Sequence, residues 1–152
     1  MAKVFVIYDK KYGNTKLVAE EIAKGLRELE GIETSINDVK DIDIEEVADS
    51  DAILIGTPNH VGRPARTIST FIDKLGGLHL KAKWVAVFDT HMANDERAMK
   101  KIEKQLTEKV PRLKLITSSL PIRVEGMKGP ITEGELPKCS EFGKRIANQL
   151  KT

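Results

Sequence analysis

The sequence predicts an α/β protein built as a three-layer, doubly wound, five-stranded parallel sheet. Three runs of nearly continuous apolar residues indicate buried strands: Lys3–Tyr8, Ala52–Gly56 and Trp84–Asp89. The segments between them place apolar residues at helical spacing. Strands that are apolar on both faces and alternate with helices form parallel sheets, because helices cover both sides of such a sheet.

The first helix is expected from Thr15 to about Glu30, directly after the first strand. Its apolar face repeats at steps of four, four and three residues: Val18, Ile22, Leu26 and Leu29. Thr15 suits the N-cap position and Gly31 suits the end of the helix. Weaker patterns then predict a short edge strand over Glu33–Asn37 and one or two helical turns over Ile44–Ala48.

The strand Ala52–Gly56 is followed by a loop, Thr57–Pro64, and by a helix from about Pro64 to Leu75. Pro64 fits the first turn of that helix, where a missing N–H costs nothing. Gly76 and Gly77 end it. The residues expected to face inward are Ile68, Phe71, Ile72 and Leu75.

The last third of the chain continues the alternation of strands and helices. The loop Thr90–Asp95 leads into an amphipathic helix, Glu96–Val110, with Met99, Ile102, Leu106 and Val110 inward. Leu113–Thr117 is the fifth strand, with an extension through Leu120–Val124 after a break at Pro121. A Gly- and Pro-rich loop, Glu125–Gly134, precedes a helix from about Glu135 to Leu150. That helix turns inward Leu136, Cys139, Phe142, Ile146 and Leu150.

Length and composition indicate a single domain over residues 1–152, with no internal repeat. The 25 Lys and Arg residues nearly balance the 23 Asp and Glu residues, so a net charge of +2 gives no argument for nucleic acid. The single cysteine, Cys139, has no partner for a disulfide, and we expect it to be a buried helix residue. No apolar run reaches membrane-spanning length, and a strand begins too early for a signal peptide, so we expect a cytoplasmic protein.

In doubly wound sheets, ligands bind beyond the carboxyl ends of the strands. Three predicted loops lie at that edge: 9–15, 57–64 and 90–95. In the first, the backbone amides near Gly13 and Asn14, together with the Thr15 hydroxyl, could surround a phosphate, and Lys10 or Lys11 could add positive charge. From the residues alone, a phosphate site and a plain strand-to-helix turn both stay open.

The other two loops could form the walls of a pocket for an aromatic ligand. Thr57 and Asn59 offer polar groups, whereas His60, Val61, His91 and Met92 offer flat or apolar surface. No neighbouring carboxylate is evident for either histidine, so ordinary loop histidines are an equal alternative. We expect no metal site, because the histidines come from separate loops and His79 lies at the far end of the sheet. No nucleophile motif is present, so any chemistry is expected to belong to a cofactor.

With these motifs in view, the chain resembles the flavodoxin-like, FMN-binding family over essentially its whole length. The segment Tyr12–Thr15 (YGNT) is similar to the end of the flavodoxin phosphate loop. Ser50–Gly62 (SDAILIGTPNHVG) is similar to the third strand and flavin loop of the family. The segments YDKKYGNT and ELPKCSEFGKRIANQL also resemble the flavodoxin domain of A-type flavoproteins, and Gly56–Leu78 resembles quinone oxidoreductases of the tryptophan-repressor-binding-protein type.

The resemblance implies FMN as cofactor, and it implies which residues contact it. The FMN phosphate would be held by Lys10, Lys11, Tyr12, Gly13, Asn14 and Thr15. One side of the isoalloxazine ring would be lined by Thr57, Pro58, Asn59, His60, Val61 and Gly62, and the other side by Thr90, His91 and Met92.

Three functions follow from the resemblance as alternatives. The first is an FMN-binding electron-transfer protein with redox partner proteins, for which this non-acidic chain would suit acidic partners. The second is an FMN-dependent NAD(P)H:quinone oxidoreductase. The third is a flavodoxin fold that has lost flavin and acts as a binding or regulatory module.

Overall fold

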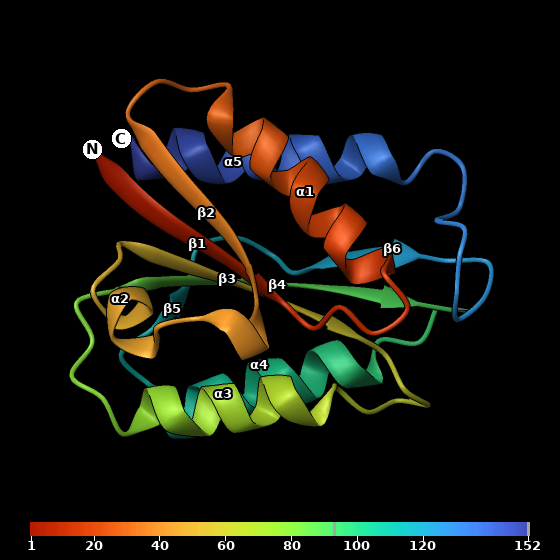
Figure 1. Ribbon diagram of the computed structural model, residues 1–152, viewed down its shortest axis with the longest axis horizontal. Coiled ribbons are helices and arrows are strands. Elements are labelled where there is room, and N and C mark those ends of the chain that lie inside the picture. Colours follow the sequence, from red (N-terminus) through yellow and green to blue (C-terminus); the bar gives the residue numbers. More distant parts are fainter. Residues whose placement is uncertain (93, 152) are drawn as a thin grey trace.

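A parallel sheet lies between two layers of helices in the computed structural model of this chain (Figure 1). The structure describes residues 1–92 and 94–151; Ala93, in the predicted loop 90–95, and Thr152 lie outside the described residues. The strands are β1 (Ala2–Tyr8), β2 (Ile32–Asp38), β3 (Ala52–Pro58), β4 (Trp84–His91), β5 (Lys114–Leu115) and β6 (Leu120–Arg123). The helices are α1 (Asn14–Arg27), the 3₁₀ helix η1 (Val39–Asp41), α2 (Ile44–Ala48), α3 (Arg66–Gly76), α4 (Arg97–Lys109) and α5 (Leu136–Leu150).

The strand order is β2-β1-β3-β4, and β5 and β6 share the fifth position beside β4. Every pairing is parallel, so the predicted doubly wound parallel sheet is confirmed. The fifth strand is interrupted at residues 116–119, and not at Pro121 as the sequence predicts. Pro121 pairs with Asp89 inside β6. A proline is tolerated there because β6 pairs with β4 alone among the described strands.

The third and fourth strands are longer than predicted. β3 continues through Thr57 and Pro58, and β4 continues through Thr90 and His91. These ends pair with each other, because Pro58 lies opposite Thr90 in the ladder. Pairing between the two segments extends both strands into residues that the sequence assigns to loops.

Two predicted helix starts are wrong. Thr15 is not the N-cap of α1, because Gly13 occupies that position and the Thr15 hydroxyl lies 3.0 Å from the hydroxyl of Thr90. α1 also ends at Arg27, before the predicted Glu30. Pro64 precedes α3 and is not in its first turn, since the following residue, Ala65, still has an extended backbone.

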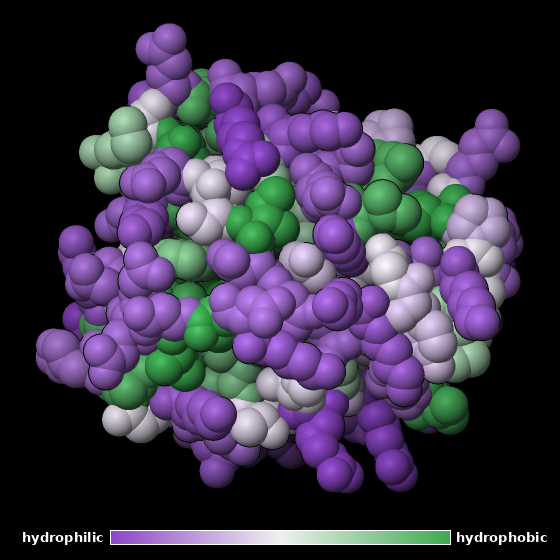
Figure 2. Space-filling model, in the orientation of Figure 1, coloured by the Kyte–Doolittle hydropathy of each residue, from purple (hydrophilic) through white to green (hydrophobic). Residues whose placement is uncertain are grey.

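The core lies on both faces of the sheet, against α1 and α5 on one side and α3 and α4 on the other (Figure 1). Nearly all the residues predicted to face inward are buried or packed against the core. Leu136 is the exception, with 40% of its surface exposed at the first position of α5. The outer surface in the same view is mostly hydrophilic (Figure 2).

Cys139 is buried in α5, as predicted. Burial raises the pKa of its thiol to about 12, with the carboxylates of Glu21 and Glu135 as further causes. The thiolate is the reactive form of cysteine, so this residue is a packing residue and not a nucleophile.

Candidate functional site

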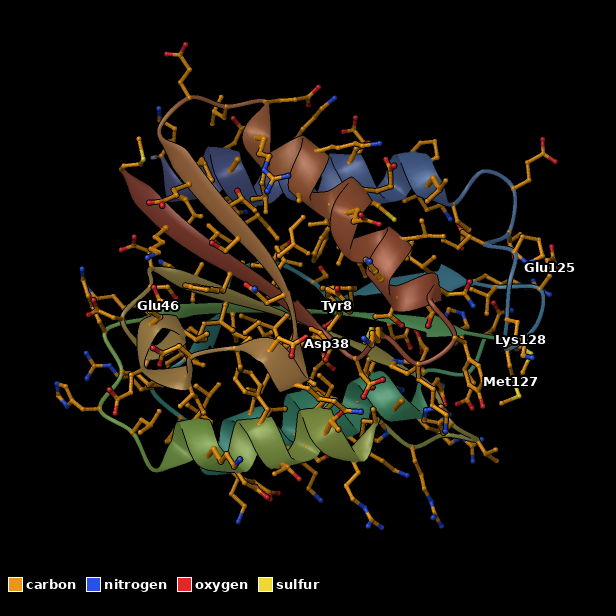
Figure 3. All side chains as sticks on the ribbon, in the orientation of Figure 1. Tyr8, Asp38, Glu46, Glu125, Met127 and Lys128 are labelled. Atoms are coloured by element: carbon orange, nitrogen blue, oxygen red, sulfur yellow. The ribbon has the colours of Figure 1, made fainter. Side chains whose placement is uncertain are left out.

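Loops from four parts of the chain meet at the carboxyl edge of the sheet. β1, β3 and β4 are parallel, so the loops that follow them leave at the same end (Figure 1). A fourth loop, between β6 and α5, reaches this edge as well, and Figure 3 shows its Met127 and Lys128 there. The described residues of the three predicted loops therefore share one edge, as the sequence predicts.

The loop between β1 and α1 is a tight turn. The Gly13 N–H donates to the Lys10 carbonyl at 2.9 Å, and the Lys11 N–H donates to the Asp9 carboxylate at 2.9 Å. Tyr12 and Gly13 both have left-handed backbones, with φ values of 67° and 83°. The Lys11 and Gly13 N–H groups therefore have acceptors within the loop, and the N–H groups at the start of α1 are the donors left for an anion.

No side chain caps the start of α1. The side chains that could do so have other partners. The Asn14 amide donates to the Met127 carbonyl at 3.0 Å, and the Thr15 hydroxyl contacts Thr90. The first N–H groups of a helix have no intrahelical acceptor, so the positive end of the helix dipole faces the loop edge without a capping oxygen.

Asn59 ties the second loop to the third. Its backbone N–H donates to the Thr90 carbonyl at 2.9 Å, and its side-chain amide donates to the Asp95 carbonyl at 2.8 Å. Its side-chain oxygen accepts from the Gly62 N–H at 2.7 Å. These bonds fix the geometry of the loop pair, which is a structural role for the Asn59 side chain.

The second loop ends in a two-residue reverse turn from His60 to Arg63, closed by two backbone hydrogen bonds of 2.8 and 3.0 Å. The central residues, Val61 and Gly62, have φ values of 51° and 80°. Positive φ is ordinary for glycine but strained for a β-branched residue. Val61 is also 87% exposed, so the loop displays an apolar side chain at a backbone position that valine disfavours.

Replacing Val61 by asparagine is expected to raise the free energy of unfolding by about 1 kcal/mol, because asparagine tolerates the left-handed region. Urea denaturation measures this change. Val61→Thr is the matched control, since threonine adds polarity but remains β-branched. An equal gain in both variants would contradict the assignment of backbone strain to Val61.

Asp89 and His91 form a buried pair at the end of β4. The Asp89 side chain has no exposed surface and His91 is only 5% exposed. The Nδ1 atom of His91 lies 3.0 Å from Oδ1 of Asp89. The sequence-based expectation that neither loop histidine has a carboxylate neighbour is therefore wrong for His91. The reason is that β4 continues to His91, and alternate residues of a strand point to the same face.

Both groups of this pair have raised pKa values. Burial raises the pKa of the Asp89 carboxyl, and the hydrogen bond to Asp89 raises the pKa of the His91 imidazole. The carboxylates of Glu135 and Asp95 act on His91 in the same direction. The second oxygen of Asp89 is buried and has no hydrogen-bond partner among the described residues.

His60 is in a different electrostatic environment. Partial burial and the ammonium group of Lys11 lower the pKa of its imidazole. The ring of Tyr12 meets the His60 ring edge to face, with 6.2 Å between centroids, and Lys11 lies over the Tyr12 ring. An aromatic side chain of the first loop therefore covers the second loop.

The loops enclose a small pocket of about 30 Å³. The predicted site residues that line it are Lys11, Tyr12, Asn14, Pro58, Asn59, His60, Thr90, His91 and Met92. The predicted residues outside its lining are Lys10, Gly13, Thr15, Thr57, Val61 and Gly62. Thr57 is directed elsewhere because its buried hydroxyl accepts from the Ala65 N–H at 2.8 Å.

Sequence reasoning missed two residues of this pocket, Val124 and Met127. Met127 lies in the predicted Gly- and Pro-rich loop Glu125–Gly134, and Val124 is the last residue of the predicted strand extension Leu120–Val124. The Met127 carbonyl accepts a hydrogen bond from the Asn14 side chain, 113 residues away in the sequence, so no local sequence pattern predicts this contact.

Within residues 1–92 and 94–151, no group of three His, Cys, Asp or Glu side chains is arranged to hold a metal ion. No helix among these residues has both the length and the apolar character needed to cross a bilayer.

The comparison with protein families matches residues 5–121 to a model described as a flavodoxin domain. A curated relative, a flavodoxin of Aquifex aeolicus strain VF5, is 39% identical over 77 residues. That match covers 51% of this chain and 42% of the length of the Aquifex protein.

The fold is shared with solved structures, among them a flavodoxin and a flavodiiron core. A flavodoxin from the domain Archaea aligns with a TM-score of 0.83 at 23% identity, covering 99% of both chains. The Flv1 flavodiiron core of Synechocystis sp. PCC6803 aligns with a TM-score of 0.80 at 21% identity, covering 99% of this chain and 36% of that one.

Proposed function

Because this chain belongs to the flavodoxin domain family, we propose that it binds FMN at the loop edge and carries electrons between protein partners. The observation that carries the proposal is the uncapped start of α1, which opens onto the loop pocket. When bound, FMN supplies one- and two-electron chemistry that no side chain of the chain supplies.

The first loop fits a phosphate group. The backbone amides at the start of α1 have no side-chain cap and are the donors for a phosphate at this edge. Lys10 and Lys11 are exposed beside this turn. They supply two positive charges in place of hydroxyl donors, acting as point charges on a dianion.

The flavin ring would bind at the same edge, and its entry requires the loops to part. The pocket volume of about 30 Å³ is that of about one water molecule. Tyr12 is partly exposed and Met127 is 52% exposed. Both side chains can therefore turn outward. Pro58 and His60 then line one side of the opening, and His91, held in its orientation by Asp89, lies at its inner end.

We propose that the partners are acidic proteins. Apolar side chains exposed around the opening are Val61, Met92 and Met127. Exposed cations of the same loops are Lys10, Lys11, Arg63 and Lys128. The fourth loop also carries the exposed carboxylates of Glu125 and Glu133, which are fewer than these cations. An apolar centre with an excess of cations around it complements an acidic surface and accelerates its association at low salt.

The experiment is a titration that follows the fluorescence of FMN and, separately, of riboflavin. Both carry the same ring, but only FMN has the phosphate. We expect FMN to be quenched on binding and to bind more tightly than riboflavin. Equal affinities for FMN and riboflavin would show that the protein does not contact the phosphate. Unquenched FMN fluorescence would favour the alternative of a fold that has lost flavin.

Replacing Lys10 and Lys11 together by glutamine is expected to weaken FMN binding by about tenfold, or about 1.4 kcal/mol, because a charged contact to the phosphate is lost. The same titration measures it, and riboflavin affinity should not change. The double variant Lys101→Gln and Lys114→Gln, at exposed positions of α4 and β5, is the control for a loss of two charges. An equal loss with the control, or for riboflavin, would contradict a phosphate contact at Lys10 and Lys11.

The NAD(P)H:quinone oxidoreductase activity that the Gly56–Leu78 segment suggests stays a prediction. NADPH oxidation with a quinone at saturating FMN tests it. A rate above that of free FMN would support an enzyme, whereas an equal rate would leave electron transfer between proteins.

A further inference from the structure

A second concave site lies on the other side of the first loop. A groove of about 520 Å³ runs between the segment that follows β2 and one side of α3, from Arg66 to Lys74. Its apolar surface comes from both sides: Val39, Ile42, Ile44 and Phe71. Figure 2 shows apolar surface between α2 and α3, surrounded by hydrophilic side chains. The groove shares no lining residue with the loop pocket.

The charged residues that line this groove are all cationic. Lys40 comes from η1, and Arg66 and Lys74 come from opposite ends of α3. All three are exposed, and among the described residues none forms an ion pair within 4 Å. No aspartate or glutamate lines the groove. Asp41, Asp43 and Asp73 are exposed beside the groove in the sequence but do not line it. The positive charge is therefore confined to the lining of the groove.

One wall of the groove is held in place. The Thr67 hydroxyl donates to Oδ2 of Asp9, and the other oxygen of Asp9 accepts from the Lys11 N–H. Asp9 is 8% exposed and lies at the end of β1, so its charge is engaged by these donors. A fixed wall lowers the ordering cost of binding.

We propose that this groove binds a small organic anion, in which an aromatic or aliphatic body carries a carboxylate. The volume is in the range of small-ligand sites, which are mostly apolar and contain a few polar groups that orient the ligand. The apolar floor would cover the body of the ligand, and either Arg66 or Lys74 would contact its carboxylate. This inference does not depend on FMN binding, because it concerns a separate site.

Three probes separate the two parts of the proposal: 2-naphthoate, its neutral counterpart 2-naphthamide, and acetate. Titrations of the full chain are followed by amide chemical shifts. We expect 2-naphthoate to shift amides of residues 39–44 and 66–74 and to bind about tenfold more tightly than 2-naphthamide, as one charge-assisted contact would give. Acetate should cause no shifts at the same concentration, because it lacks the apolar body.

The double variant Arg66→Gln and Lys74→Gln should bind the two naphthalene probes equally. Lys101→Gln, outside the groove, should retain the tenfold preference. Thermal unfolding checks that each variant is folded, and these exposed side chains are not part of the core. Equal binding of 2-naphthoate and 2-naphthamide by the unaltered chain would overturn the proposal. Shifts confined to residues outside the groove, or an undiminished preference in the double variant, would overturn it as well.

Discussion

Replacing Gly143 by alanine is expected to lower the free energy of unfolding by about 3 kcal/mol, the largest effect of a single methyl group that we predict. A Cβ atom at Gly143 would lie 2.1 Å from the Ile22 carbonyl oxygen and 2.9 Å from the Leu26 backbone nitrogen. Both are main-chain atoms of α1, so no side chain can move aside. Helices α1 and α5 would have to separate, although both pack against the same face of the sheet.

Chemical denaturation measures this effect, and two further variants sharpen it. Gly77→Ala is the control, because its Cβ would meet only an ordinary contact at 3.6 Å, and the change should stay within about 0.5 kcal/mol. Gly25→Ala faces the same interface, with its Cβ 2.0 Å from the Ser140 carbonyl oxygen. The double variant Gly25→Ala and Gly143→Ala should cost less than the sum of the singles, since one separation of the helices accommodates both. A Gly143→Ala protein as stable as the control would contradict this packing.

Replacing Asp89 by asparagine is expected to lower the free energy of unfolding by about 3 kcal/mol at pH 6, because a buried charged imidazole loses its partner. Asparagine keeps the shape of the side chain, so the change is electrostatic. In the altered protein only burial and the more distant carboxylates of Glu135 and Asp95 act on His91. Its imidazole pKa should therefore fall. A pH titration followed by NMR of the histidine rings measures it, with His60 and His79 as internal references.

The stability difference should also depend on pH. The folded pKa of His91 is raised above its ordinary value of 6.5, so its protonation stabilises the fold fully below pH 6.5. That contribution is lost as the pH rises through the folded pKa. The raised pKa of Asp89 also lowers the free energy of unfolding as the pH rises. This effect begins at the ordinary Asp pKa of 3.8 and therefore belongs to the acid range. The gap between the unaltered chain and Asp89→Asn should consequently narrow from pH 6 to pH 8.5.

Urea denaturation across this pH range tests the prediction. Asp49→Asn, an exposed carboxylate after α2, is the control for the loss of one negative charge. A gap that stays constant with pH, or a His91 pKa that does not fall, would show that the hydrogen bond between Asp89 and His91 does not carry the proton affinity of His91.

Periodicity and apolar runs predict the layers of this fold because they are local properties. The runs within β1, β3 and β4 are apolar on both faces, which only a sheet covered on both sides can bury. The edge strand β2 has the mixed pattern of a strand with one covered face. A doubly wound sheet places the ends of β1, β3 and β4 together, so the position of the candidate site also follows from strand order and chain direction.

Helix starts and strand ends were predicted less well, since they depend on partners far along the chain. The Thr15 hydroxyl has the composition of an N-cap, but it lies beside Thr90 in the folded chain. Pro58 and Thr90 have the composition of loop residues, but each extends a strand because the other is opposite. The pairing of Asp89 with His91 was in reach of sequence reasoning, because their spacing of two residues is that of one strand face.

By itself, the sequence determined the α/β class, the burial of Cys139, the shared loop edge and the resemblance to flavodoxins. Only the tertiary structure decided which of those loop residues line the pocket, and it added Met127 from a loop with no motif. It alone brought Lys40 beside Arg66 and Lys74 over an apolar floor. The physical reason is the range of the interactions. Backbone propensity and apolar period act within one element, whereas a pocket is made of side chains that meet only after the sheet has placed their elements.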